Sequence, residues 1–262
     1  MIDIISSVWR KRELVLEMSR RELFGGHGGH LLGGVWVFVN PLLMVLSYYI
    51  VFHFIFPSRL PKGGSSDVFL LAGLIQWIVL SDMIVRSCTV LRGHMNLVRQ
   101  INFPLETLFA KTVVIGLFIQ IVMTLGLLLL IGLLGAGLDV ETGLLWLLAM
   151  CVQSVFMMGT ALILGAATPF LPDLNEVVGV FARLGLFLTP ILYQAERFGP
   201  KIQTAFYLNP FSWFAWIHQD ALSSGAIDRP WAWIGAATIA VLSLLIGAKL
   251  FKALKHSFAD VL

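Results

Sequence analysis

Two histidines, His27 and His30, lie three residues apart within the glycine-rich sequence GGHGGHLLGG at residues 25–34. Histidine is a frequent metal ligand, and glycine-rich loops can cradle phosphate groups, so this stretch first raises these two chemistries. No third ligand lies nearby, and the spacing lacks the GxxxxGK[ST] pattern of a nucleotide-binding loop. We therefore expect no metal site here, while contact with the phosphate of a lipid or substrate headgroup stays open.

The glycines of this stretch favour a structural role. They precede a long apolar run, and a chain that passes from a surface helix into a perpendicular membrane span must bend sharply. Glycine permits such a bend because it has no Cβ, and it also allows helices to approach closely. We predict a hinge at Gly25, Gly26, Gly33 and Gly34.

Charged residues inside apolar stretches are the next candidates, because ionisable groups within a membrane are costly and often functional. Asp82 and Arg86 lie four residues apart on one helix face. They either neutralise each other near the cytoplasmic end of a span or form a polar element of a transport path. Arg183, in a later apolar stretch, either anchors that span at the interface or faces a phosphate-bearing substrate.

Enzyme motifs are missing from the sequence. There is no GxSxG, HExxH, CxxC or Walker pattern, and Cys88 and Cys151 lie in separate apolar stretches, so they imply no zinc site or disulfide framework. We therefore predict no catalytic residue and no cofactor in this chain. A membrane-embedded glycosyltransferase or acyltransferase is an alternative that would need a convergent set of acid, base and acceptor-binding groups, which the sequence does not show.

The composition defines the elements that must carry these residues. Hydrophobic residues make up 58% of the 262 positions and charged residues 13%, and the mean hydropathy is +0.88. Soluble domains carry roughly 25% charged residues, so the sequence predicts an integral membrane protein. The net charge of +3 favours basic segments beside a membrane over nucleic-acid binding.

Long apolar runs predict an all-α integral membrane protein with one transmembrane domain over 1–262. A helix needs about 20 apolar residues to span the hydrocarbon core. Six transmembrane helices are expected, at 31–58, 68–91, 106–135, 143–169, 176–195 and 230–252.

The distribution of positive charge argues against a seventh span at 202–219, where an Asn-Pro pair also breaks the helical pattern. With six spans, the inner segments hold twelve Lys and Arg residues and the outer segments five, with Arg86 unassigned. This imbalance follows the positive-inside rule with both termini cytoplasmic. We therefore predict that residues 196–228 are external and dip into the membrane as broken, re-entrant helices between spans five and six.

Residues 3–24 precede the first predicted span and have an amphipathic pattern. Charged residues such as Arg10 and Arg21 fall on one side of a helix, and apolar residues such as Val15 and Leu16 fall on the other. This pattern predicts an interfacial helix on the cytoplasmic surface of the membrane. Packing on a soluble partner is the alternative.

The sequence LRGHMNLVRQINFPLETL at residues 91–108 is polar and basic and lies between the second and third predicted spans. A short cytoplasmic helix at 92–105 would suit docking to a soluble subunit. Because this chain has no nucleotide-binding sequence, such a subunit would have to bind ATP and Mg. The predicted contact residues are Arg92, His94, Asn96, Arg99 and Phe103.

Two groups of aromatic residues fit a path for sugars, because sugar rings pack their C–H faces on aromatic side chains. Anchoring of Trp and Tyr at the membrane interface accounts for any single residue equally well. The first group is Trp36 with Trp77, and the second is Phe206, Tyr207, Trp213, Phe214 and Trp216.

Seven short sequences occur in order along the chain: RREL, LLGGVWVFVNPLL, LAGLIQW, NLVRQINFPLETL, PFLPDLNEV, LTPILY and LNPFSWF. In this combination they resemble the permease subunits of ABC-2 type exporters for surface polysaccharides, which include O-antigen, capsule and teichoic-acid exporters. The resemblance covers essentially the whole chain. FGGHGGH departs from the basic-aromatic segment that is usual in the family at that point.

The resemblance implies a homodimer in the bacterial cytoplasmic (inner) membrane, with two copies of an ABC ATPase subunit bound on the cytoplasmic side. It implies export of a lipid-linked polysaccharide, of O-antigen or capsule type, with ATP hydrolysed by the partner subunit. It also identifies residues 92–103 as the coupling helix. Export of teichoic acid, a drug or a small lipid is the alternative within transport, and INFPLETL and LNPF favour the polysaccharide branch.

Overall fold

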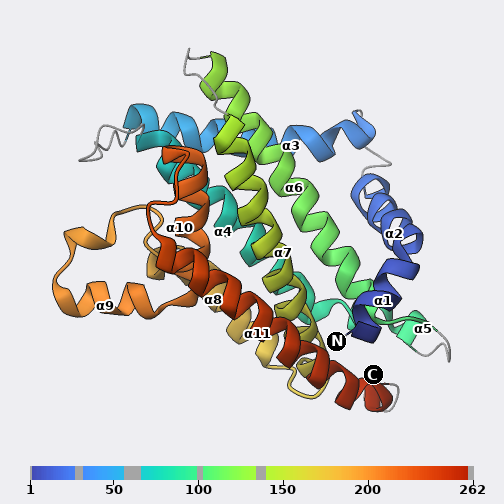
Figure 1. Cartoon of the computed structure of the whole chain (residues 1–262). Coiled ribbons are helices and arrows are strands. Elements are labelled where there is room, and N and C mark those ends of the chain that lie inside the picture. The colour runs from blue at the N-terminus through green and yellow to red at the C-terminus, as the bar shows by residue number, and fades with distance from the viewer. Residues whose placement is uncertain (1, 27–31, 56–65, 99–102, 134–139, 259–262) are drawn as a thin grey trace.

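The computed structural model describes residues 2–26, 32–55, 66–98, 103–133 and 140–258, and within these ranges the chain is helical without strands (Figure 1). This confirms the predicted all-α class. The main helices are α1 (Ile2–Arg10), α2 (Arg12–Gly25), α3 (Trp36–Ile50), α4 (Ser66–Thr89), α5 (Met95–Val98), α6 (Glu106–Leu133), α7 (Val140–Ala167), α8 (Leu174–Leu188), α9 (Pro200–Leu208), α10 (Pro210–Gln219) and α11 (Pro230–Leu254).

Five helical stretches within the described ranges are long and apolar enough to cross a membrane. They overlap the predicted first, second, third, fourth and sixth spans. The ends of two predictions, residues 31 and 56–58 of the first and 134–135 of the third, lie outside the described residues. The five stretches are Gly33–Ile55, Asp67–Thr89, Glu106–Leu133, Val140–Ala167 and Pro230–Ser257.

The predicted fifth span, 176–195, is not a continuous helix. Its helix α8 has 15 residues and is therefore about 22 Å long, less than the roughly 30 Å of a hydrocarbon core. The helix ends at Leu188, and Thr189 has extended backbone angles. Pro190 explains this end, because a residue that precedes proline is disfavoured in the α conformation.

The N-terminal segment is two helices rather than the single helix predicted over 3–24. They are separated at Lys11, whose φ of −103° and ψ of 22° are not helical. Both helices pack against α6. Val15 is buried, whereas Leu16 is 58% exposed. The apolar residues of this segment therefore divide between the protein core and the outer surface instead of sharing one face.

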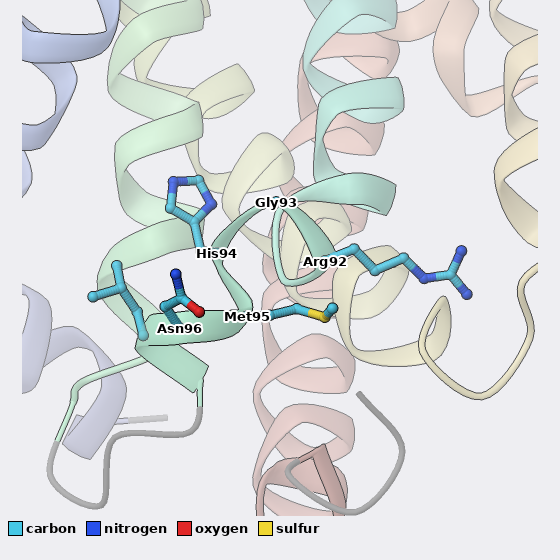
Figure 2. Close-up of a pocket in the computed structure, with 6 residues that line it drawn as sticks. Arg92, Gly93, His94, Met95 and Asn96 are labelled. Atoms are coloured by element: carbon cyan, nitrogen blue, oxygen red, sulfur yellow. The ribbon is translucent and has the colours of Figure 1, made fainter.

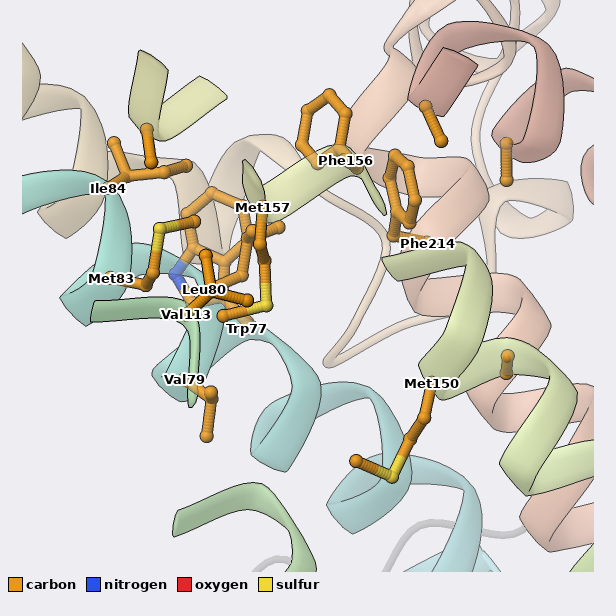
Figure 3. Packing of buried hydrophobic residues seen from close by; sticks show 14 of the residues in the cluster. Trp77, Val79, Leu80, Met83, Ile84, Val113, Met150, Phe156, Met157 and Phe214 are labelled. Carbon is orange, nitrogen blue, oxygen red and sulfur yellow. The ribbon is translucent and has the colours of Figure 1, made fainter. Parts of the chain in front are cut away.

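Helix α4 is the centre of the packing, with α6, α7, α8 and α10 around it. Its side chains Trp77, Leu80 and Met83 lie in one buried cluster with Met157 and Phe214 (Figure 3). These residues place two separate predicted spans, 68–91 and 143–169, and the 196–228 segment in one core.

Helices α7 and α11 approach each other closely. A Cβ on Gly159 would lie 2.4 Å from the backbone nitrogen of Leu244, and a Cβ on Gly247 would lie 2.5 Å from the carbonyl oxygen of Gly159. Neither distance leaves room for a side chain, so glycine at both positions permits the contact. Such small-residue contacts are typical of helices packed within membranes.

Helices α9 and α10 occupy the segment 196–228, and Asn209 separates them. The side chain of Asn209 accepts a hydrogen bond from the backbone nitrogen of Phe211 at 3.0 Å and donates one to the carbonyl of Leu188 at 3.1 Å. Helix α10 is largely buried against α4 and α11, whereas α9 lies at the edge of the molecule (Figure 1).

Helix α1 and the C-terminal end of α11 lie at the same end of the molecule as α5 (Figure 1). Glu106, the first residue of α6, holds this end together. Its carboxylate accepts a hydrogen bond from Ser7 of α1 at 2.5 Å and one from Lys255 at 3.1 Å. The N-terminal helices, the start of α6 and the C-terminal end are thus joined.

Candidate functional site

The segment predicted to dock a soluble subunit is helical from Arg92 to Val98, as a 3-10 turn η3 (Arg92–His94) followed by α5. A surface cavity of about 440 Å³ is lined by residues 92–97 (Figure 2). Arg92 and Asn96 are exposed, and the Arg92 side chain extends away from His94. This segment, called the docking segment below, comprises residues 92–98.

Residues 103–105 of the helix predicted at 92–105 are not helical. Arg99 lies outside the described residues. Phe103 is half-buried in non-helical backbone, and α6 begins three residues later at Glu106. Pro104 accounts for the non-helical backbone at Phe103, because proline disfavours the α conformation of the residue before it.

Asp82 and Arg86 form an ion pair within α4, with Nε of Arg86 2.7 Å from Oδ2 of Asp82. The pair belongs to a longer polar network. Arg86 lies 3.7 Å from Glu22 of α2, and Glu22 lies 2.5 Å from Nζ of Lys111 on α6. Lys111 also lies 3.1 Å from the ring of His94. Sequence analysis did not identify Glu22 or Lys111, because no spacing rule connects residues on separate helices.

Several of the aromatic residues predicted to line a sugar path fill the core of the chain. Trp77 makes ring contacts with Phe181 and Phe211. Phe214 stacks on Phe156 with ring centroids 4.4 Å apart (Figure 3). Both residues pack against protein within one chain, and their contact with substrate stays a prediction.

Trp36 and Trp77, which form the first predicted aromatic group, have different surroundings. Trp36 lines a cavity of about 330 Å³ between α2, α3, α4 and α6. Glu22, Asn40 and Arg86 contribute polar groups to this cavity, and most of the other lining residues are apolar. The first aromatic group is therefore divided between the core and a partly polar cavity.

Two members of the second aromatic group, Tyr207 and Trp216, form a cluster with Trp231 beside the start of α11, whereas Phe206 contacts Tyr193 and Phe198. The rings of Tyr207 and Trp216 have centroids 5.3 Å apart, and each lies 5.2 Å from the ring of Trp231. Trp213 donates its indole N–H to the carbonyl of Tyr207 at 2.9 Å. Trp231 is distant from the aromatic-rich sequence, so the sequence did not associate it with this cluster.

The buried carboxylate of Asp220 binds two side chains beside this aromatic cluster. Asp220 begins the π-helical turn η5 (Asp220–Ser224), and its Oδ1 lies 2.6 Å from Nη1 of Arg229. Its Oδ2 accepts a hydrogen bond from the indole of Trp233 at 3.3 Å. Burial raises the pKa of Asp220, and the nearby Arg229 guanidinium acts in the opposite direction. The contacts position Arg229 over the Trp216 ring, 5.8 Å from its centroid.

Three neutral polar side chains form a second network within the core. Nε2 of Gln153 donates to Oε1 of Gln120 at 2.9 Å, and Nε2 of Gln120 lies 3.0 Å from Nε2 of His218. Nδ1 of His218 bonds the carbonyl of Phe214 at 2.9 Å. The network joins α6, α7 and α10. Neutral amides within apolar helices give no charge signal, so this network could not be recognised from the sequence.

The predicted hinge has one glycine with left-handed backbone angles. Gly33 has a φ of +50°, and a Cβ on Gly34 would lie 2.9 Å from the ring of Phe24. Gly25 ends α2 and Gly26 caps it with ordinary helical angles. His27 and His30 lie outside the described residues, so the hinge and the absence of a metal site stay predictions.

Arg183 is exposed on α8, where its Nε donates to the carbonyl of Gly179 at 3.1 Å. The bond lies within one turn of the same helix, so the side chain follows the surface of α8. Its predicted roles, an anchor at the interface or a contact with substrate, remain open.

Known proteins are similar to this chain in sequence over most or almost all of their length. The O-antigen export system permease protein RfbA of Myxococcus xanthus is 24% identical over 262 residues, which cover 99% of each chain. An RfbA permease of Klebsiella pneumoniae is 22% identical over 95% of each chain, and the polysialic acid transport protein KpsM of Escherichia coli is 22% identical over 88% of this chain and 90% of its own.

The same relationship appears at the level of the family. The sequence pattern of the family described as ABC-2 type transporter matches residues 14–217, which include the docking segment and four of the five candidate spans. Together with those apolar helices, the match identifies a multi-pass membrane protein. The chain belongs to the ABC-2 type transporter family.

Proposed function

We propose that this chain is the membrane-spanning subunit of an ATP-driven exporter that moves a lipid-linked surface polysaccharide, of O-antigen or capsule type, across the bacterial cytoplasmic membrane. The observation that carries the proposal is the similarity to O-antigen permeases along almost the whole chain. The related polysialic acid transport proteins support the same class of substrate. Because the sequence has no nucleotide-binding motif, a separate subunit would bind ATP and Mg and hydrolyse the ATP.

In the proposed topology six helices cross the membrane, with α8 as the fifth, and both termini are cytoplasmic. The position of α1 and of the C-terminal end of α11 at the same end of the molecule as α5 supports this orientation, because the docking segment must face the cytoplasm (Figure 1). Helix α8 is short for a span. Helices α9 and α10 would complete its passage as external re-entrant helices.

The docking segment would bind the ATPase subunit. Its exposed Arg92 and Asn96 are available to a partner, and an arginine can make strong, directional hydrogen bonds to carboxylates. Arg99 and Phe103 would extend the same contact. His94 has a different role, because its ring is bonded within the chain.

Two copies of the chain would form the complete permease, with one ATPase subunit on each. Helix α3 supports this arrangement, because large apolar side chains on it are exposed in the single chain. Such a surface must be covered by lipid or by another protein chain. The exposed residues include Phe38, Leu42, Leu46 and Ile50.

The cluster of Tyr207, Trp216 and Trp231 would contact sugars near the external end of the path. Tyr207 is half-buried and Trp231 is exposed, so ring surface remains available to a ligand. Sugar C–H faces pack on such rings. This arrangement favours a polysaccharide over the alternative of a drug or small lipid.

The docking assignment is tested by reversing the charge of Arg92. We expect Arg92→Glu to lower co-purification of the ATPase subunit by about tenfold or more, because losing charge-assisted hydrogen bonds costs roughly 1.5–3 kcal/mol. The permease itself should still insert in the membrane, because Arg92 is exposed. Lys201→Glu, a charge reversal at an exposed residue of α9, is the matched control. Wild-type amounts of bound ATPase in Arg92→Glu would contradict the assignment.

A further inference from the structure

Lys111 carries a positive charge in a buried position one turn into α6. Its side chain is 3% exposed. An ammonium group in such a position is destabilising unless polar partners surround it. Two partners are present: Oε2 of Glu22 at 2.5 Å and Nε2 of His94 at 3.1 Å. They belong to different elements, α2 and the docking segment, so one buried cation joins both.

The ring of His94 is held from two sides. Nδ1 lies 2.8 Å from the carbonyl oxygen of Val90, which can only accept a hydrogen bond, so Nδ1 carries the donated proton. Nε2 then offers a lone pair to Lys111, whose ammonium group can only donate. The ring is turned toward α6, opposite to the Arg92 side chain (Figure 2). A rotation or displacement of the docking segment would therefore change the bond to Lys111.

Glu22 connects the other side of Lys111 to the N-terminal helix. Its second oxygen, Oε1, lies 3.7 Å from Arg86 on α4, which is a longer contact than the 2.5 Å to Lys111. Glu22 is three residues before the end of α2, and the predicted hinge follows directly.

We propose that Lys111 is a positioning residue that couples the docking segment to α2, so that displacement of the segment by an ATPase subunit is transmitted through His94, Lys111 and Glu22 to the N-terminal helix. This inference rests on the proposed function, because it requires the ATPase subunit as the source of movement. Separating either His94 or Glu22 from Lys111 would leave its buried charge with one polar partner fewer, which is destabilising. The three side chains are therefore expected to move together.

Hydrogen exchange of backbone amides, measured by mass spectrometry on the intact permease alone and bound to its ATPase subunit, tests this link. In the wild type, binding should slow exchange in residues 92–98 and also in α2. In Lys111→Met, residues 92–98 should still be protected, while the added protection of α2 is lost. Glu22→Gln should behave in the same way, and its side chain is 40% exposed, so this variant is expected to fold.

Two matched variants separate the link from general damage. Lys255→Met removes another lysine at the same end of the molecule, whose partner is Glu106. Glu17→Gln removes a carboxylate on α2 whose ion-pair partner, among the residues that the structure describes, is Arg21 of the same helix. Both controls should retain the protection of α2.

The inference is overturned if Lys111→Met and Glu22→Gln keep the protection of α2, or if α2 of the wild type is unaffected while residues 92–98 are protected. Absence of protection at residues 92–98 of the wild type would instead refute docking itself. The inference and the proposed docking would then both be wrong. Co-purification of the ATPase subunit tests docking independently of hydrogen exchange, so the two failures can be distinguished.

Discussion

Buried polar side chains form hydrogen bonds between separate helices of this chain, and the neutral network around Gln153 is an example. Gln153 of α7 exchanges hydrogen bonds with Gln120 of α6, and Gln120 reaches His218 of α10. All three side chains are buried. A buried amide without a partner costs more than the bond contributes, so the three residues depend on one another.

We expect Gln153→Leu to lower the free energy of unfolding by about 1–3 kcal/mol, because Gln120 loses a buried partner. Thermal unfolding of the purified protein in detergent, followed by tryptophan fluorescence, measures the effect. Ser154→Ala is the control, because the Ser154 hydroxyl donates to the carbonyl of Cys151 in its own helix and to no other helix of the described part of the chain. Equal unfolding temperatures for both variants would contradict the structural role of the network.

Residues differ in how far their contacts follow from the sequence. Asp82 and Arg86 were recognisable as a pair because neighbours four apart share a helix face. Lys111 could be assigned to a helix but not to its partners, since Glu22 and His94 reach it only through tertiary packing. Gln120 and Gln153 carry no charge, so their positions within apolar helices attracted no functional prediction.

Among the elements, the long apolar helices could be predicted from hydropathy, because length and composition alone define a candidate span. The end of α8 could not be predicted in this way, because hydropathy takes no account of the backbone conformation that Pro190 imposes. The separation of α1 from α2 at Lys11 has no marker in the sequence, because neither proline nor glycine lies there.

The predicted hinge between α2 and α3 gives a prediction about how two elements are connected. We expect Gly33→Val and Gly34→Val each to reduce folded yield and export. At Gly33 the positive φ is strained by about 1–2 kcal/mol for other residues, and at Gly34 the added side chain meets Phe24. Membrane-inserted protein and exported polysaccharide are the two readouts.

The matched control is Gly143→Val on α7, outside the predicted hinge, because nothing lies within 4 Å of a Cβ at Gly143. Replacing His27 and His30 together by Gln should leave export largely intact if this stretch holds no metal. Loss of export in the histidine variant, with Gly33→Val and Gly34→Val tolerated, would revive the metal interpretation.

For the whole molecule, the proposed topology places the turn before α11 on the external side of the cytoplasmic membrane. Ser224 is exposed in this turn, so Ser224→Cys should react with an impermeant thiol reagent added to intact spheroplasts. The background requires Cys88→Ala and Cys151→Ala, because these are the native cysteines. Labelling that appears only after the membrane is ruptured would show that the orientation is inverted.

ATP-dependent movement of a lipid-linked polysaccharide in proteoliposomes is the most direct test of the account. The permease would be reconstituted with its ATPase subunit, and the substrate would be labelled lipid-linked polysaccharide from the host membrane. We predict that this substrate stimulates ATP hydrolysis and crosses the bilayer only when ATP is present, and that unlinked polysaccharide does neither. A complex whose ATP hydrolysis responds to a drug or simple lipid, but not to lipid-linked polysaccharide, would contradict the central claim.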